Sequence, residues 1–316
     1  MTTPIPTPTP QPNPPHYKVK VFFRRLFSSL VLWGVVLTAM FSGNKPFSNY
    51  VFLFIMVVLA GMGLIEFYDM ALKRNLVCFR NWGVFGGVML MVGTFLHFSG
   101  KLGIWDTPAR VNDFETSFLI VFVLGLCLRQ FVSHSNTAGI EAISVTLFGL
   151  MYVPWLLNFI QKIHFFPFAH GDRWSGPFYV LYFILVTKFS DTGAYAVGSI
   201  LGKHKMIPRI SPGKTWEGFA GGILVSTGAS VLFWKLAGPR LAGMTLFHSI
   251  VLGIVLSVAA VVGDLIESLF KREAGVKDSG TRFPGIGGIL DLLDSLLFNA
   301  PLMYLYLRHV LTKPTL

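Results

Sequence analysis

GDLIESLFKR (263–272), KDSG (277–280), PGIGG (284–288) and DLLDS (291–295) bring charged residues and glycines together between two apolar segments. Asp291 and Asp294 lie three residues apart, so their carboxylates share one face of a helix. Asp264 and Ser268, four residues apart, share a face in the same way. Carboxylates at membrane depth are costly unless they are paired, hydrated or bound to a cation, so they indicate a functional site. The simpler interpretation is a solvated loop whose acidic residues offset a helix dipole.

The rest of the chain is strongly apolar. Of its 316 residues, 53% are hydrophobic and only 13% are charged, whereas soluble domains carry about 25% charged residues. The sequence therefore predicts an all-α, polytopic integral membrane protein. The net charge of +11 is explained by basic residues in cytoplasmic loops, so we expect no nucleic-acid partner. Cys78 and Cys127 are far apart and form no metal-binding or disulfide pattern.

A membrane-spanning helix needs about 20 mainly apolar residues, and the sequence contains about nine such segments. Pro154 interrupts the fifth, and the sixth is the least apolar because it holds Lys188 and Asp191. Glu66, near the end of the second, is expected at the membrane interface. The predicted spans are residues 24–41, 50–68, 82–99, 115–132, 138–160, 176–199, 217–236, 245–266 and 288–308.

Composition divides the chain into three parts. Residues 1–20 form a Pro-rich tail that is predicted to be disordered. Residues 21–174 form the N-terminal membrane helices, and residues 175–316 contain the C-terminal membrane helices with the polar cytoplasmic loops. With the N-terminus inside, 16 of the 26 Lys and Arg residues fall in cytoplasmic segments and 9 on the opposite side, with Lys188 inside a span. This asymmetry predicts a cytoplasmic N-terminus and an external C-terminus.

Two further polar stretches precede the last two spans. The first is SDTGAY (190–195), which includes Ser190 and Asp191, and the second is ISPGKTWEG (210–218), which includes Lys214. Gly213-Lys214-Thr215 suggests a P-loop, but that motif needs a glycine at position 208, which is Pro. We also expect no strand before it. The sequence therefore does not predict a P-loop.

Carboxylates beside basic residues suggest a divalent metal together with phosphate. Mg²⁺ is usually held by one or two carboxylates and by substrate phosphates, and a pair of metals can stabilise both oxygens of an in-line displacement. Asp264 and Asp291 are the favoured ligand pair, with Asp294 as a further ligand and Ser268 as support. The expected cofactor is Mg²⁺, with room for a second cation.

Several of these features have a simpler structural interpretation. Lys203 and Lys205 suit anionic lipid headgroups, and Asp191 with Lys188 suits a neutralising pair inside a span. Gly287 and Gly288 suit close helix packing as well as phosphate binding at a helix N-terminus. The sequence alone leaves these alternatives open.

The three motifs together resemble the phosphatidate cytidylyltransferase (CDP-diacylglycerol synthase) family. The residues that match its signature lie between positions 268 and 295, and the motifs around Ser190 and Lys214 match as well. The matching signature residues are Ser268, Lys271, Arg272, Lys277, Asp278, Gly280, Pro284, Gly285, Gly287, Gly288, Asp291, Asp294 and Ser295. Two positions depart from the family pattern, since Ile286 replaces a histidine and Leu292 an arginine.

The resemblance implies transfer of CMP from CTP to phosphatidic acid, which gives CDP-diacylglycerol and pyrophosphate. It implies catalytic roles for Asp264, Asp291, Lys271 and Asp294, of which the three aspartates hold metal. It implies a protein in the cytoplasmic (inner) membrane, in contact with membrane lipid, and suggests a homodimer. The residues implied in substrate binding are Ser190, Asp191, Lys214, Ser268, Arg272, Lys277, Asp278, Gly287 and Gly288.

Other functions stay open at this point. A CTP-dependent polyprenol or phytol kinase would transfer the terminal phosphate to a lipid alcohol, and Leu292 makes a changed acceptor conceivable. An ion-coupled transporter would use Asp191, Asp264 and Asp291 without nucleotide. A membrane scaffold without catalytic activity would not bind CTP.

Overall fold

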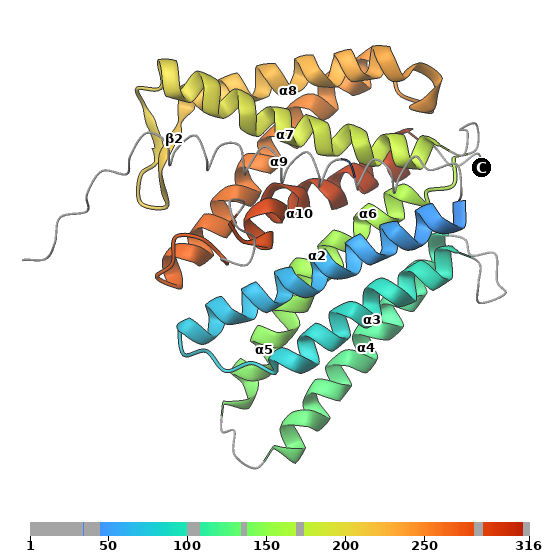
Figure 1. Cartoon of the computed structure of the whole chain (residues 1–316), viewed down its shortest axis with the longest axis vertical. Coiled ribbons are helices and arrows are strands. Elements are labelled where there is room, and N and C mark those ends of the chain that lie inside the picture. The colour runs from blue at the N-terminus through green and yellow to red at the C-terminus, as the bar shows by residue number, and fades with distance from the viewer. Residues whose placement is uncertain are drawn as a thin grey trace, which may run out of the picture.

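The computed structural model describes residue 34 and residues 45–99, 108–133, 138–168, 174–280 and 287–311. The predicted tail (1–20), nearly all of the first predicted span (24–41) and Pro284, Gly285 and Ile286 lie outside these residues. The described part is a bundle of long helices (Figure 1). Its main elements are α2 (Lys45–Lys73), α3 (Arg80–Phe98), α4 (Pro108–Val132), α5 (Gly139–Leu150), α6 (Leu156–His164), α7 (Ser175–Leu201), α8 (Trp216–Ala237), α9 (Leu246–Glu273) and α10 (Ile289–Tyr306).

Seven helical segments in the described part are long and apolar enough to cross a membrane. They correspond to seven of the predicted spans. The eighth predicted span in the described part, 176–199, is the 27-residue helix α7, which is more polar and is not one of the seven. An all-α polytopic architecture is thus confirmed, while the count of nine and the orientation of the N-terminus stay predictions.

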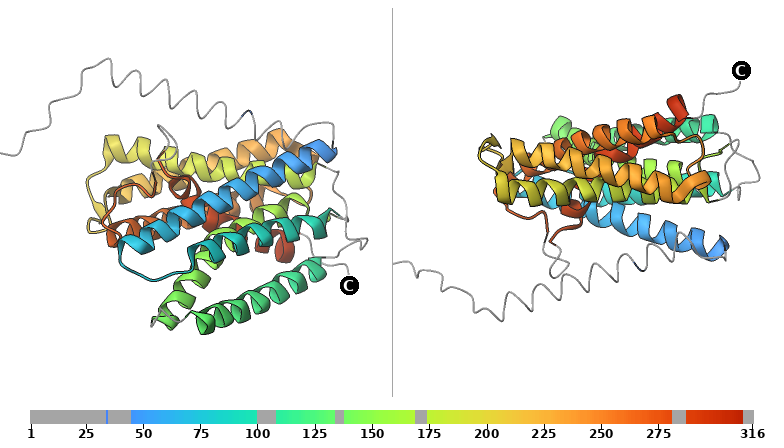
Figure 2. Two further views of the ribbon diagram at one scale, coloured as in Figure 1. Left: turned by 60° about the horizontal axis from the view of Figure 1, so that its bottom comes forward. Right: turned by 90° about the horizontal axis from the view of Figure 1, so that it is seen from above.

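Helix α10 occupies the middle of the bundle. It packs against α9 and α7 on one side and against α2 and α6 on the other, and Figures 1 and 2 show it between these groups. Its apolar residues Leu290, Leu297 and Ala300 are completely buried. The N-terminal end of this central helix therefore lies where both halves of the chain meet.

The interruption predicted at Pro154 is present. Residues Met151–Trp155 form one π-helical turn between α5 and α6, because proline cannot donate the backbone hydrogen bond that a regular helix requires. The flanking helices continue in one direction, and together they form the span Gly139–His164.

A β hairpin between α7 and α8 was not predicted. Strand β1 (Lys205–Ile207) pairs antiparallel with β2 (Ser211–Thr215), so the expectation of no strand before α8 is wrong. Strands this short, one of them containing Pro212 and Gly213, carry no alternating hydrophobic pattern. Thr215 then caps α8, since its hydroxyl oxygen accepts a hydrogen bond from Gly218 N at 3.1 Å.

Helix α9 extends further than the predicted span, which ended at residue 266. It continues to Glu273, and Glu267 and Lys271, one turn apart on this helix, form a buried ion pair that supports its last turns. It ends before Gly275, whose φ of +66° suits glycine. Lys271 and Arg272 are therefore residues of the same helix as Asp264 and Ser268.

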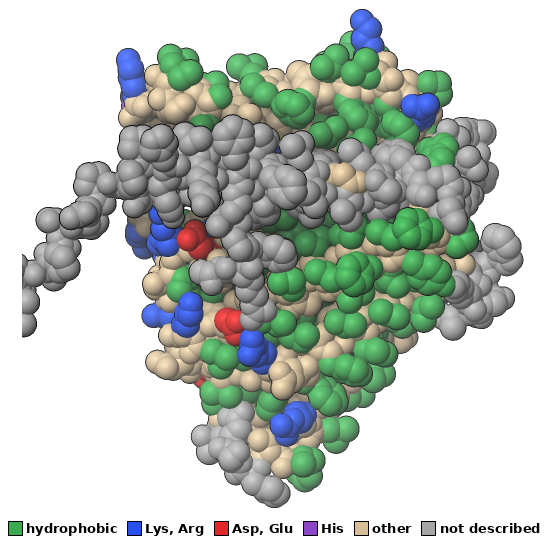
Figure 3. Space-filling view, viewed as in Figure 1, with side chains coloured by type: hydrophobic (Ala, Val, Ile, Leu, Met, Phe, Trp, Pro, Cys, Tyr) green, Lys and Arg blue, Asp and Glu red, His purple; other side chains and the backbone are tan. Residues whose placement is uncertain are grey.

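Charged side chains gather mainly at one end of the bundle. In Figure 3 most Lys and Arg side chains of the visible face lie near the hairpin and the nearby ends of α2 and α9, while hydrophobic side chains cover much of the rest. Lys73, Lys205 and Arg272 belong to these elements. This end is hereafter the polar end, and it carries the N-terminus of α10.

Candidate active site

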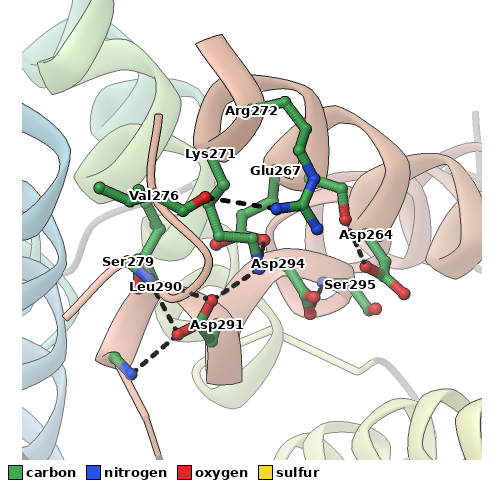
Figure 4. Close-up of polar contacts among 12 residues, drawn as sticks. Asp264, Glu267, Lys271, Arg272, Val276, Ser279, Leu290, Asp291, Asp294 and Ser295 are labelled. Carbon is green, nitrogen blue, oxygen red and sulfur yellow. Dashed lines mark hydrogen bonds and ion pairs between the residues drawn. The ribbon is translucent and has the colours of Figure 1, made fainter. Parts of the chain in front are cut away.

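The helices α9 and α10 pack closely against each other at Gly263. A Cβ atom there would lie 2.6 Å from the backbone oxygen of Asp294, so only glycine permits this contact. The close approach brings three carboxylates together, with one oxygen from each of Asp264, Glu267 and Asp294 within 4.8 Å of the others. We call this group the carboxylate cluster, and Figure 4 shows it at the crossing of the two helices.

Glu267 is the member of the carboxylate cluster that sequence reasoning missed. Its side chain is fully buried, and its Oε1 atom accepts no hydrogen bond from the described residues. Its other oxygen pairs with Lys271. A signal was present in the sequence, since Glu267 lies three residues after Asp264 and four before Lys271. A buried carboxylate with a free oxygen can accept a cation.

Asp291 has a different environment from Asp264 and Asp294. Its carboxylate accepts hydrogen bonds from Gly288 N at 2.8 Å and Ser279 N at 3.1 Å. It also pairs with Lys271, whose Nζ lies 2.7 Å from Oδ1. Among the described residues, the structure thus groups Asp264 with Glu267 and Asp294, while Asp291 lies directly beside Glu267 and shares Lys271 with it. The metal role of Asp291 stays a prediction.

A cavity of about 400 Å³ adjoins the carboxylate cluster. It is lined by α7, the hairpin, α8 and α9, and its charged lining residues are Asp191, Lys214 and Asp264. Lys214 Nζ lies 2.9 Å from Asp264 Oδ2, and it also donates to the backbone oxygen of Val261 at 3.2 Å. Asp264 therefore belongs to both the cavity wall and the carboxylate cluster, and it joins the two into one site.

Asp191 faces the same cavity from α7. Its carboxylate lies 3.6 Å from Lys188 Nζ, which is the neutralising pair that the sequence suggested. Ser190, the neighbouring candidate, is completely buried and bonds Ser257 Oγ at 2.7 Å. The structure places Ser190 in the contact between α7 and α9, outside the lining of the cavity.

The remaining candidates lie around this site. Ser268 Oγ donates to Asp264 Oδ1 at 3.3 Å, in the supporting position expected for it. Arg272 is exposed and donates to the backbone oxygen of Ile210 beside the hairpin at 3.3 Å. Lys277 and Asp278 are exposed in the segment after α9. Ser268 thus contacts the cluster directly, and the substrate-binding roles of Arg272, Lys277 and Asp278 stay predictions.

Gly287 and Gly288, which precede α10, are each required to be glycine for a different structural reason. Gly287 has a φ of +93°, a conformation that glycine adopts readily. Gly288 is confined by its neighbours, because a Cβ there would lie 1.9 Å from Ser279 Oγ and 2.6 Å from Glu66 Oε2. Close packing therefore explains Gly288, and the predicted phosphate contact of either glycine stays a prediction.

Comparison with known proteins assigns the chain to a family. Residues 23–310 match the model of the Cytidylyltransferase family. The chain is 31% identical over 295 residues to the phosphatidate cytidylyltransferase of Haemophilus influenzae, a match that covers 91% of this chain and 99% of that protein.

Other bacterial relatives match to a similar extent. The phosphatidate cytidylyltransferase of Chlamydia pneumoniae is 30% identical over 91% of this chain and 94% of its own length. That of Bacillus subtilis is 31% identical over 90% of this chain and 97% of its own length. Because the matches extend across nearly the whole chain, this protein belongs to the cytidylyltransferase family.

Proposed function

We infer that this protein is a membrane-bound phosphatidate cytidylyltransferase that makes CDP-diacylglycerol. A phosphate oxygen of phosphatidate would bond to the α-phosphorus of CTP while the bond from that phosphorus to the bridging oxygen breaks. The products are CDP-diacylglycerol and pyrophosphate. The observation that carries this proposal is one site at the polar end of an apolar bundle, where a cavity with Lys214 adjoins the carboxylate cluster.

The chemistry requires positioning and charge neutralisation more than proton transfer. The attacking phosphate is already anionic, so a strong general base is not needed. Preorganised charges that oppose the developing charge are then the main source of acceleration. Lys214 is the residue best placed to contact a phosphate, because it is the basic residue among those lining the cavity and its side chain is partly exposed. Lys271 is held between Glu267 and Asp291, so its first role is to orient these two carboxylates.

The carboxylate cluster suits Mg²⁺, the cofactor predicted from the sequence. Three carboxylate oxygens within 4.8 Å of one another, one of them from a glutamate with an oxygen that accepts no hydrogen bond from the described residues, match the all-oxygen ligands that Mg²⁺ prefers. Asp264, Glu267 and Asp294 would hold the ion. When bound, a divalent cation neutralises the charge of the triphosphate. A second cation and a contribution from Asp291 belong to the same proposal.

We further propose that the polar end faces the cytoplasm, in the inner membrane, where CTP and phosphatidate meet. Apolar residues cover much of the outside of the bundle, for example Ile140, Leu224 and Phe247, all strongly exposed. Such residues fit contact with lipid acyl chains. The acceptor lipid would then reach the cavity from the membrane and the nucleotide from water. The homodimer suggested by the family resemblance remains part of this proposal.

Product analysis tests the proposed reaction. Purified protein in mixed micelles with CTP, dioleoyl phosphatidate and Mg²⁺ is expected to produce CDP-diacylglycerol and pyrophosphate in equal amounts. Asp264→Asn should abolish both products, because it removes a charge shared by the cavity and the cluster. Asp69→Asn is the matched control, since Asp69 forms a partly exposed pair with Arg80 and should leave turnover near the wild-type rate.

The same experiment separates the alternatives. Release of CDP with phosphorylation of an added polyprenol would indicate a lipid kinase. Equal background in wild-type protein and Asp264→Asn would contradict enzymatic turnover at this site.

A further inference from the structure

Glu66 links the N-terminal half of the chain to the candidate active site. It lies on α2, and its side chain is only 2% exposed. Glu66 is therefore buried inside the protein, and the expectation that it lies at the membrane interface is wrong. Its Oε2 atom accepts hydrogen bonds from Ser279 Oγ at 3.0 Å and from Leu290 N at 2.9 Å. One carboxylate oxygen of α2 therefore accepts hydrogen bonds from two residues that lie more than 200 positions away along the chain.

Both of these positions support Asp291. The backbone N–H of Ser279 donates to Asp291 while the hydroxyl of the same residue donates to Glu66. Leu290 N lies in the first turn of α10, where backbone N–H groups have no acceptor within the helix, so it donates to Glu66 instead. A carboxylate near that helix end is also favourable for the helix dipole. Asp291 belongs to the same turn of α10. Glu66 thus fixes the segment and the helix end that together orient the Asp291 carboxylate.

Two glycines pack closely against the Glu66 carboxylate. A Cβ atom at Gly280 would lie 2.3 Å from Glu66 Oε1, and one at Gly288 would lie 2.6 Å from Oε2. Gly280 and Gly288 therefore lie directly against the Glu66 carboxylate, and a larger side chain at either position would displace it. A buried carboxylate is costly without hydrogen-bond donors. The hydrogen bonds that Ser279 and Leu290 donate to Glu66 are therefore a specific buried link between α2 and the site.

We propose that Glu66 is a positioning residue for the transfer reaction, acting through Ser279 and the first turn of α10 on Asp291. This proposal rests on the proposed function for its kinetic consequences. It gives the N-terminal membrane helices a direct part in the reaction. The catalytic motifs of the C-terminal half then depend on a side chain of α2 for their alignment.

Substitutions of both partners in the hydrogen bond between Glu66 and Ser279 provide the kinetic test. Glu66→Leu is expected to lower kcat about tenfold or more, because small displacements of reacting groups are costly in rate, while KM for dioleoyl phosphatidate stays unchanged. Glu66→Gln should recover most of the rate, since its amide oxygen can accept both hydrogen bonds. Ser279→Ala should lower kcat as well, and the double variant Glu66→Leu/Ser279→Ala should be no slower than the slower single variant.

A second variant covers the case in which Glu66→Leu does not fold. Gly280→Ala keeps every hydrogen-bonding group but displaces the Glu66 carboxylate, and it is expected to lower kcat in the same way. Asp69→Asn, on the same helix, is the control and should not change kcat. Wild-type rates in Gly280→Ala and Ser279→Ala, or effects of Glu66→Leu and Ser279→Ala that multiply independently, would overturn the proposal.

Hydrogen–deuterium exchange separates this proposal from the proposed function. Glu66→Leu should speed exchange at residues 276–280 and 287–292 and leave the hairpin at 205–215 unchanged. If that change occurs but the wild-type protein has no turnover, the bond exists and the proposed function fails. If the wild-type protein turns over and exchange in Glu66→Leu equals that of the wild type, the positioning role fails.

Discussion

Asp264 is the residue on which the cavity and the carboxylate cluster both depend. It pairs with Lys214 at 2.9 Å, accepts a hydrogen bond from Ser268, and lies near the carboxylates of Glu267 and Asp294. A single side chain thus adjoins both a basic group that fits phosphate and an acidic group that fits a cation. This arrangement explains why phosphate binding and cation binding are expected to be coupled.

Lys214 should contribute mainly to nucleotide binding. A hydrogen bond to a charged group contributes about 1.5–3 kcal/mol, so Lys214→Met is expected to raise KM for CTP roughly 10- to 100-fold. Steady-state kinetics with varied CTP provides the measurement. Lys205→Met is the control, because Lys205 is exposed on the neighbouring strand, and it should change KM less than threefold in the absence of a phosphate contact. Equal KM values in all three proteins would remove Lys214 from the binding site.

Residue-level prediction from the sequence succeeded where the spacing was local. Asp264 and Ser268 share a helix face as their spacing required. The ion pair of Lys214 with Asp264 was not predicted, because the two residues lie far apart in the sequence. Glu267 was missed, although its spacing to Asp264 and Lys271 carried a signal. Glu66 had no such signal, because its partners lie on another part of the chain and only the folded structure brings them together.

At the level of elements, the contact between α9 and α10 determines the carboxylate cluster. Gly263→Ala would place a Cβ atom 2.6 Å from the backbone oxygen of Asp294, so the helices must move apart. We expect this variant to lower kcat about tenfold or more, because the carboxylates separate. The measurement is turnover together with the Tm of the purified protein in detergent.

Gly228→Ala on α8 is the matched control for that prediction. A Cβ atom at Gly228 meets nothing within 4 Å, and replacement of a helical glycine by alanine stabilises a helix by up to about 1 kcal/mol. Its turnover should equal that of the wild type, with an equal or higher Tm. Wild-type turnover in Gly263→Ala would show that the reaction does not need the close contact.

The elements themselves were predicted best where hydrophobicity decides them. The long apolar spans and the interruption at Pro154 follow from composition and from the missing proline donor. The hairpin was missed because its strands are three and five residues long. The end of α9 was placed too early because its last turns are polar, and their ion pair faces the site instead of lipid.

For the whole molecule, the concentration of basic residues at the polar end predicts how the protein lies in the membrane. In a variant without Cys78 and Cys127, Lys205→Cys on the hairpin should react with a membrane-impermeant maleimide only after the membrane is permeabilised. A cysteine at Arg240, beyond the opposite end of α8, should react in intact cells. The reverse pattern would place the polar end outside and contradict the proposed access to CTP.

The fate of the phosphorus atoms of CTP tests the proposed reaction most directly. Purified protein is incubated with dioleoyl phosphatidate, Mg²⁺ and CTP that carries radioactive phosphorus at either the α or the γ position. Transfer of CMP predicts that the α label enters the lipid fraction and the γ label leaves as pyrophosphate, with neither transfer in Asp264→Asn. Entry of the γ label into lipid, or equal α labelling of lipid by wild type and Asp264→Asn, would contradict the proposed reaction at this site.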